Sequence, residues 1–129
     1  YVDKPAISFD YSMFETWFPN EETKYHSWMK GRQLLIDRMI EDNVIDTSKP
    51  HHLLGCSLPQ EFAHYRNLPW MDSVDTSNPV VHGIKGIRYK DHGLDDKESV
   101  KLFTLVDEEV TQHLDDIEYN IQRFREFCQ

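Results

Sequence analysis

The sequence HHLLGCSLPQEF, residues 51–62, is followed closely by WMDSVDTSNP, residues 70–79. Each stretch begins with a short apolar run that ends in small and polar residues. A helix start follows the first run, and aspartates and a proline follow the second. This pattern is typical of buried parallel strands whose C-terminal ends open onto an active site. We therefore predict strands over residues 52–56 and 70–74.

Helical patterns occupy much of the remaining chain. Apolar residues recur every three or four positions over residues 21–42, where Asn20 is a suitable N-cap, and again over residues 97–127. Both stretches are predicted to be amphipathic helices. The other predicted elements are a short strand over 6–11, a short helix that starts near Pro59, a helical turn over 79–83, and a small strand or loop over 84–89.

The predicted order is strand, helix, strand, helix, strand, helix, which implies parallel strands joined by right-handed crossovers. A complete TIM barrel has eight such units and needs about 250 residues, whereas this sequence has 129. The expected fold class is therefore α/β, with three βα units that form the C-terminal part of a TIM barrel and end in a long amphipathic helix. Residues 1–129 would be a single domain or a barrel fragment. Pairing with a second copy and a small open sheet are the alternatives.

The composition, with 39% hydrophobic and 29% charged residues, is that of a globular protein. No apolar run approaches the roughly 20 residues that span a bilayer, and no signal-peptide pattern occurs. Two distant cysteines favour a reducing compartment, so we expect a cytoplasmic protein without membrane association. The net charge of -9 disfavours a large nucleic-acid surface but allows a local basic patch around Lys85, Arg88 and Lys90.

Polar residues at the ends of the predicted strands are the candidate functional residues, because parallel strands share a mouth at that edge. Asp72 and Asp75 are three positions apart, so on a strand only one of them can face the mouth unless the backbone turns between them. That carboxylate is a candidate nucleophile or general base. The alternative is a pair of loop carboxylates that cap the turn before Pro79. The further candidates at strand ends are Asp10, Cys56 and Ser57.

The histidines and basic residues form no recognisable ligand motif. None of the seven histidines belongs to an H-x-x-x-H or H-E-x-x-H pattern, so neither a metal site nor a cofactor is expected. His51 and His52 are adjacent and would face opposite ways on a strand. Lys30, Gly31 and Arg32 are predicted to belong to a solvated helix face rather than to a phosphate-binding site.

The stretches LLGCSLPQE, residues 53–61, and MDSVDTSNP, residues 71–79, continuing to Gly83, resemble the queuine tRNA-ribosyltransferase (tRNA-guanine transglycosylase) superfamily. They are also similar to the related deazapurine DNA insertases of phages and bacteria. The shared pattern is a strand reading L-hydrophobic-G, then a small residue and a proline-acidic helix start. A D-x-x-D strand follows, with a proline four residues beyond its second aspartate. The resemblance covers roughly a quarter of the chain.

The resemblance implies a TIM barrel that exchanges a base at an N-glycosidic bond of a nucleic acid. It assigns the attack on the ribose C1′, with a covalent intermediate, to Asp75, the second aspartate of the motif that Asp72 begins. A carboxylate suits this role because it is ionised at neutral pH. Leu54 would pack on the base, and Gly55 would let the base approach the backbone. Beside them, the expected pocket includes Cys56, Ser57 and Asp10.

Three departures from the family pattern bear on the substrate and on completeness. No residue matches the family's other essential aspartate, and the zinc motif of the tRNA enzymes is absent. The arginines that follow the family's proline and grip RNA are replaced by Val80, Val81 and His82. DNA is therefore the expected nucleic-acid partner rather than tRNA. This chain is expected to be an incomplete catalytic unit, which a homo-oligomer would complete.

Two other functions agree with the same sequence. A non-enzymatic α/β interaction module would use the last helix as its partner face, and it predicts no converging carboxylates and strands that are not all parallel. Another TIM-barrel enzyme with a different substrate is the second alternative, because that architecture supports many chemistries.

Overall fold

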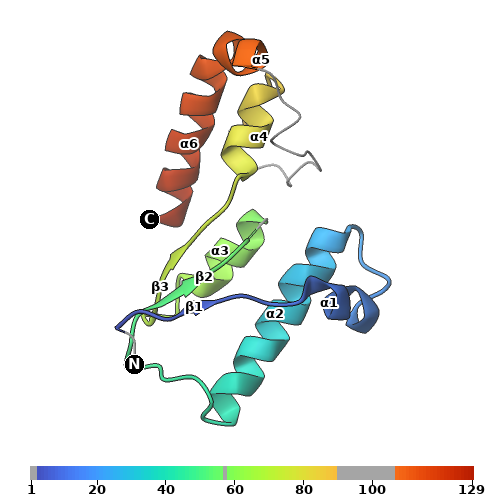
Figure 1. The fold of residues 1–129 in the computed structure, drawn as a ribbon, viewed down its shortest axis with the longest axis vertical. Coiled ribbons are helices and arrows are strands. Elements are labelled where there is room, and N and C mark those ends of the chain that lie inside the picture. The colour runs from blue at the N-terminus through green and yellow to red at the C-terminus, as the bar shows by residue number, and fades with distance from the viewer. Residues whose placement is uncertain (1–2, 57, 90–106) are drawn as a thin grey trace. The chain divides into compact units, whose positions relative to one another are not determined.

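The computed structural model describes residues 3–56, 58–89 and 107–129 (Figure 1). The chain is an α/β protein that divides into two compact units. Unit 1 takes its described residues from 1–56 and 64–75, and unit 2 from 57–63 and 76–129. The elements are β1 (Ala6–Ile7), α1 (Tyr11–Trp17), α2 (Lys24–Glu41), β2 (His51–Leu53), α3 (Pro59–Tyr65), β3 (Met71–Val74), α4 (Asn78–Ile84), α5 (Asp107–Gln112) and α6 (Leu114–Cys128).

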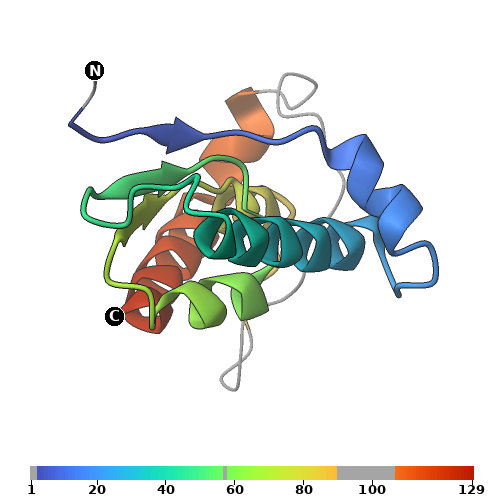
Figure 2. The same ribbon diagram turned by 90° about the horizontal axis from the view of Figure 1, so that it is seen from below.

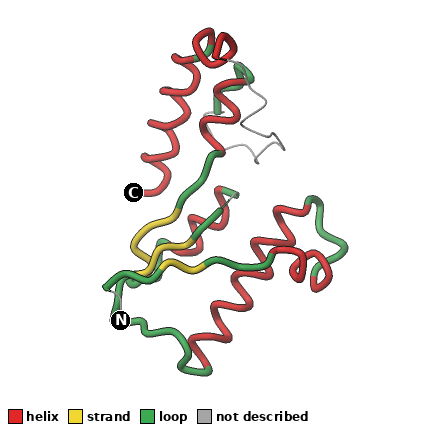
Figure 3. The backbone as a smooth tube through the Cα atoms, in the orientation of Figure 1, coloured by secondary structure: helices red, strands yellow, loops and turns green. Residues whose placement is uncertain are grey.

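A three-stranded parallel sheet lies in unit 1, with the strands side by side in the order β1-β2-β3 (Figure 3). The predicted parallel arrangement is confirmed. His52 is the central pairing residue, since it lies beside Ala6 on one neighbour and beside Ser73 on the other. Because all three strands run the same way, their C-terminal ends meet at one edge of the sheet.

The strands are shorter than predicted. The predicted strand 52–56 ends at Leu53, because Gly55 has a φ of 72°, in the left-handed region that extended strands do not use. The predicted strand 6–11 ends at Ile7, and helix α1, which the sequence reading missed, begins at Tyr11.

Asp10 starts α1 rather than ending a strand. Its Oδ1 accepts hydrogen bonds from the backbone N of Ser12 at 3.1 Å and from the Ser12 hydroxyl at 2.7 Å. An aspartate that accepts from the second residue after it is a typical N-cap. The Ser12 hydroxyl and then its N–H hold the pKa of Asp10 below the usual 3.8.

Helices α1 and α2 pack closely, and α2 lies beside the sheet in both views (Figures 1 and 2). A Cβ added at Gly31 would lie 2.3 Å from the Phe14 ring, so only glycine permits this approach. The helix predicted over 21–42 begins at Lys24, with Thr23 as its N-cap. The buried face of α2 includes Arg32, which is only 1% exposed. The prediction that Arg32 faces solvent is therefore wrong.

Unit 2 is built around the contact between α4 and α6. A Cβ added at Gly83 would lie 2.5 Å from the Cα of Ile117, so the two backbones nearly touch. Phe62 and Phe124 stack edge to face with ring centroids 4.7 Å apart. Asn120 is fully buried, and its amide nitrogen donates to the carbonyl of Ile87 at 2.8 Å. Residues 85–89 therefore form a loop that is hydrogen-bonded to α6.

The long helix predicted over 97–127 is interrupted. Helix α5 ends at Gln112, and His113 is the N-cap of α6, which begins at Leu114. Residues 97–106 of the predicted helix lie outside the described residues. The apolar spacing is correct for α6, but it does not reveal a change of helix axis at a single residue.

The α4–α6 contact predicts a strong effect of a single methyl group. Gly83→Ala forces the two helix backbones apart and should lower the free energy of unfolding of unit 2 by about 1–3 kcal/mol. Chemical denaturation followed by circular dichroism measures the change. Glu118→Ala, at an exposed position of α6, is the control and should stay within about 0.5 kcal/mol of the wild type. Equal stabilities of the Gly83→Ala variant and the wild type would contradict this packing.

Candidate active site at the C-terminal ends of β2 and β3

The backbone of Asp75 continues the pairing of β2 and β3 beyond the end of β3. Its N–H donates to the carbonyl of Leu53 at 3.4 Å, and its carbonyl accepts from the N–H of Cys56 at 3.1 Å. Its carboxylate Oδ1 accepts the N–H of Gly55 at 2.9 Å. The Asp75 side chain is nevertheless 56% exposed. The carboxylate is thus held at the strand exit while still open to solvent.

The segment over residues 54–56, which follows β2, lies next to Asp75 at this exit. Arg32 reaches it from α2 and donates to the carbonyl of Leu54 at 2.7 Å and to that of Gly55 at 3.2 Å. The hydroxyl of Tyr11 donates to the Leu54 carbonyl as well, at 2.8 Å. A Cβ at Gly55 would lie 2.8 Å from that hydroxyl, so this position requires glycine on two grounds.

Arg32 is suited to this position by its shape and by its surroundings. A guanidinium presents several donors in a fixed planar fork, which can serve two neighbouring carbonyls at once. Its carbon Cζ lies 5.0 Å from the ring centre of Tyr11 and 5.8 Å from that of Phe9, within the range of a cation–π contact. The position of Arg32 in the sequence could have indicated that it is buried, because it is four residues before the buried Ile36 on the apolar stripe of α2.

His52 and Ser73 connect to the same carboxylate. The imidazole Nδ1 of His52 lies 2.8 Å from the Ser73 hydroxyl, and its Nε2 lies 3.3 Å from Oδ1 of Asp75. His52 and Ser73 are cross-strand neighbours, and Asp75 is two residues beyond Ser73, so the three side chains share one face of the sheet. Sequence reasoning missed this group, because the alignment of β2 with β3 is not visible in either strand alone.

The other predicted site residues lie apart from this cluster or beneath it. Asp72 forms an exposed ion pair with Lys4, on the face opposite Asp75, as the three-residue spacing requires. Asp10 is occupied as the N-cap of α1. Cys56 is buried, with its sulfur 3.5 Å from a guanidinium nitrogen of Arg32, and Leu54 is 36% exposed. Ser57 lies outside the described residues.

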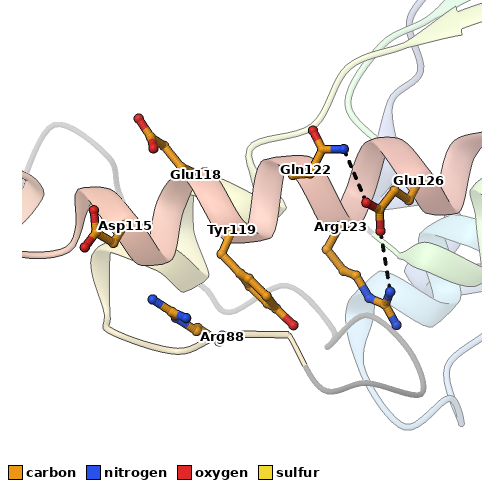
Figure 4. A pocket seen from close by; sticks show the side chains of 7 residues that line it. All are labelled: Arg88, Asp115, Glu118, Tyr119, Gln122, Arg123 and Glu126. Atoms are coloured by element: carbon orange, nitrogen blue, oxygen red, sulfur yellow. Dashed lines mark hydrogen bonds and ion pairs between the residues drawn. The ribbon is translucent and has the colours of Figure 1, made fainter.

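A shallow groove on α6, in unit 2, has a volume of about 540 Å³ (Figure 4). Arg88 beside it donates to Asp116 at 2.6 Å and lies 5.0 Å from the ring centre of Tyr119. This hydrogen bond, and then that of His113, holds the pKa of Asp116 below its usual 3.8. The groove holds more carboxylates than guanidinium groups, which disfavours a phosphate ligand. Its lining residues are Arg88, Asp115, Glu118, Tyr119, Gln122, Arg123 and Glu126.

Metal-binding clusters and membrane-spanning helices are both absent from the described residues. In that part of the chain, no three or more His, Cys, Asp or Glu side chains are grouped so that they could hold a metal ion. None of the helices described is both long enough and apolar enough to cross a membrane.

The contacts of Arg32 predict its contribution to stability. Arg32→Met removes the donors to two carbonyls and should lower the free energy of unfolding of unit 1 by about 2–4 kcal/mol. The matched control is Arg38→Met on the same helix, where exposed ion pairs to Glu41 and Asp42 should contribute less than about 1 kcal/mol. Urea denaturation of both variants measures the difference. Similar losses for the two substitutions would show that the segment over residues 54–56 does not depend on Arg32.

Comparison with models of known protein families, with curated proteins and with solved structures finds no match for this chain.

Proposed function

We propose that this chain contributes the catalytic carboxylate of a transglycosylase-like enzyme that exchanges a base at an N-glycosidic bond of a nucleic acid. The observation that carries the proposal is the position of Asp75. Its carboxylate lies at the shared exit of two parallel strands, is oriented by the N–H of Gly55, and is 56% exposed. An oriented and accessible carboxylate at this edge of an α/β sheet is what a nucleophile of this class needs.

The chemistry follows from the properties of a carboxylate. It is ionised at neutral pH, so it can attack the ribose C1′ without first losing a proton. The C1′–N bond breaks as the bond from Asp75 to C1′ forms, and the departing base takes a proton from water. An incoming base then attacks C1′, loses its proton to water and releases the carboxylate. The two displacements exchange one base for another without a redox partner.

The sheet supports the barrel assignment within this proposal. Strands that are adjacent in the sequence are adjacent in the sheet, and helices separate them in the sequence, α1 and α2 between β1 and β2 and α3 between β2 and β3. Strands and helices alternate in the same way in a TIM barrel. The strands needed for closure would come from other parts of the same protein or from a second copy. The parallel pairing also disagrees with what the interaction-module alternative predicts.

The exposed side chain of Leu54, just after β2, supports the proposed base pocket. Leu54 is 36% exposed and follows β2 at the sheet edge where Asp75 lies, so its side chain offers an apolar surface for a planar base. At Gly55, the space of the missing side chain is occupied by the Tyr11 hydroxyl, which would lie 2.8 Å from a Cβ there, so Leu54 is the residue that carries the proposed pocket. We assign DNA as the nucleic acid and a deazapurine as the incoming base, and we place the protein in the cytoplasm. Val80, Val81 and His82 stand where the tRNA enzymes have arginines.

The test is base exchange by variants of the two aspartates. The assembled enzyme, in which other parts of the same protein or a second copy supply the strands needed for closure, is incubated with double-stranded DNA and free 7-deazaguanine. Inserted base is measured by mass spectrometry of the digested nucleosides. Asp75→Asn should reduce exchange by roughly 10³-fold or more, because an amide is a poor nucleophile. Asp72→Asn should retain it, because Asp72 pairs with Lys4 on the other face.

A covalent protein–DNA adduct, seen on a denaturing gel, should form with the wild type and the Asp72→Asn variant and disappear with the Asp75→Asn variant. Melting curves of both variants control for folding. Undiminished exchange by the Asp75→Asn variant would overturn the assignment of the nucleophile. Lack of exchange by the wild-type protein, on either DNA or tRNA, would overturn the proposed activity.

A further inference from the structure

We infer that His52 is a positioning residue for Asp75, which holds Oδ1 of the carboxylate and leaves Oδ2 as the attacking atom. This inference rests on the proposed function and assigns a different role to each of the two carboxylate oxygens. Its basis is the chain of contacts from the Ser73 hydroxyl to Nδ1 of His52 at 2.8 Å and from Nε2 to Oδ1 at 3.3 Å.

The chemistry of the groups sets their roles in these contacts. The Ser73–His52 contact is a hydrogen bond, whereas Nε2 of His52 lies at ion-pair distance from Oδ1 of Asp75, 3.3 Å away. A carboxylate oxygen only accepts, so a proton between His52 and Asp75 would be on Nε2. In a neutral imidazole the other nitrogen is then an acceptor, and the Ser73 hydroxyl donates to it. Cross-strand pairing of His52 with Ser73 holds the two side chains together. A Ser73 hydroxyl that donates to Nδ1 therefore favours the tautomer with its proton on Nε2, the nitrogen that approaches Asp75.

Both donors converge on one oxygen. Among the described residues, the contacts of the Asp75 carboxylate come from the Gly55 N–H at 2.9 Å and from Nε2 of His52, and both are made to Oδ1. Hydrogen bonds to an ionised group are stronger than those between neutral groups and fix its orientation. Oδ2 is therefore the oxygen that is available to form the bond to C1′.

The contacts to Oδ1 of Asp75 have their largest effect when the covalent glycosyl ester breaks down. In the glycosyl ester, Oδ2 is bonded to C1′ and Oδ1 is the carbonyl oxygen. When the incoming base attacks C1′, the Oδ2–C1′ bond breaks and its electron pair returns to the carboxylate, which again shares negative charge with Oδ1. Donors already aimed at Oδ1 stabilise that developing charge without rearrangement. Loss of the His52 donor should therefore slow the breakdown of the ester more than the attack of Asp75 on C1′. The ester should then accumulate.

The same three residue types occur in serine hydrolases, but the positions favour the carboxylate as nucleophile. Ser73 and His52 lie within β3 and β2, whereas Asp75 lies beyond the strand end. The side chain of Asp75 is 56% exposed, against 26% for that of His52. In this arrangement Ser73 orients His52, so Ser73→Ala should lower the rate of base exchange only slightly.

The test compares two substitutions of similar length at position 52. Glutamine can place an amide N–H near the position of Nε2, whereas methionine cannot donate. His52→Met should reduce kcat for base exchange roughly 10- to 100-fold, with KM nearly unchanged, and should raise the steady-state fraction of covalent adduct. His52→Gln should recover most of the kcat. Equal impairment of both variants would indicate a packing role and overturn the inference, as would wild-type kcat in the His52→Met variant.

A second readout needs no substrate. The imidazole ¹⁵N signals of His52, assigned by their loss in the His52→Gln variant, should move in the Asp75→Asn variant and stay in place in the Asp72→Asn variant. Unmoved signals in both variants would overturn the inference while leaving the proposed function intact. Lack of exchange by the wild-type protein would instead overturn the proposed function, and the role of His52 in catalysis with it.

Discussion

The buried guanidinium of Arg32 and the carbonyls of Leu54 and Gly55 form the contact on which the candidate site depends. Burying a charge is costly unless its donors meet acceptors. Two guanidinium nitrogens of Arg32 reduce this cost by donating to the carbonyls of Leu54 and Gly55 at 2.7 and 3.2 Å. In the same segment, the N–H of Gly55 donates to the Asp75 carboxylate.

This contact depends in turn on how closely two helices approach. Gly31 lets Phe14 lie directly against α2, and α1 brings Tyr11 to the same Leu54 carbonyl that Arg32 binds. A larger residue at position 31 would push α1 away and remove the hydroxyl that shares the Leu54 carbonyl. The geometry of the carboxylate therefore rests on helix packing as well as on strand pairing, and the two are joined through Arg32.

The sequence predicts the sheet better than the parts that complete the site. Two apolar runs ending in small residues are enough to place parallel strands and to put Asp75 after the last of them. Helix α1 was missed because Asp10 followed an apolar run and was interpreted as a strand end. Arg32 was misplaced because its charge was weighed above its position on the apolar stripe. The pairing of His52 with Ser73 depends on strand alignment, which requires the folded sheet.

Amide hydrogen exchange at Gly55 tests most directly whether its N–H is hydrogen-bonded to the Asp75 carboxylate. Gly55 is exposed, so its N–H should exchange rapidly unless it is held by Oδ1 of Asp75. We expect slow exchange in the wild-type protein and in the Asp72→Ala variant, and exchange near the rate of an unstructured peptide in the Asp75→Ala variant. Rapid exchange of the Gly55 amide in the wild-type protein, or protection that survives Asp75→Ala, would contradict the account.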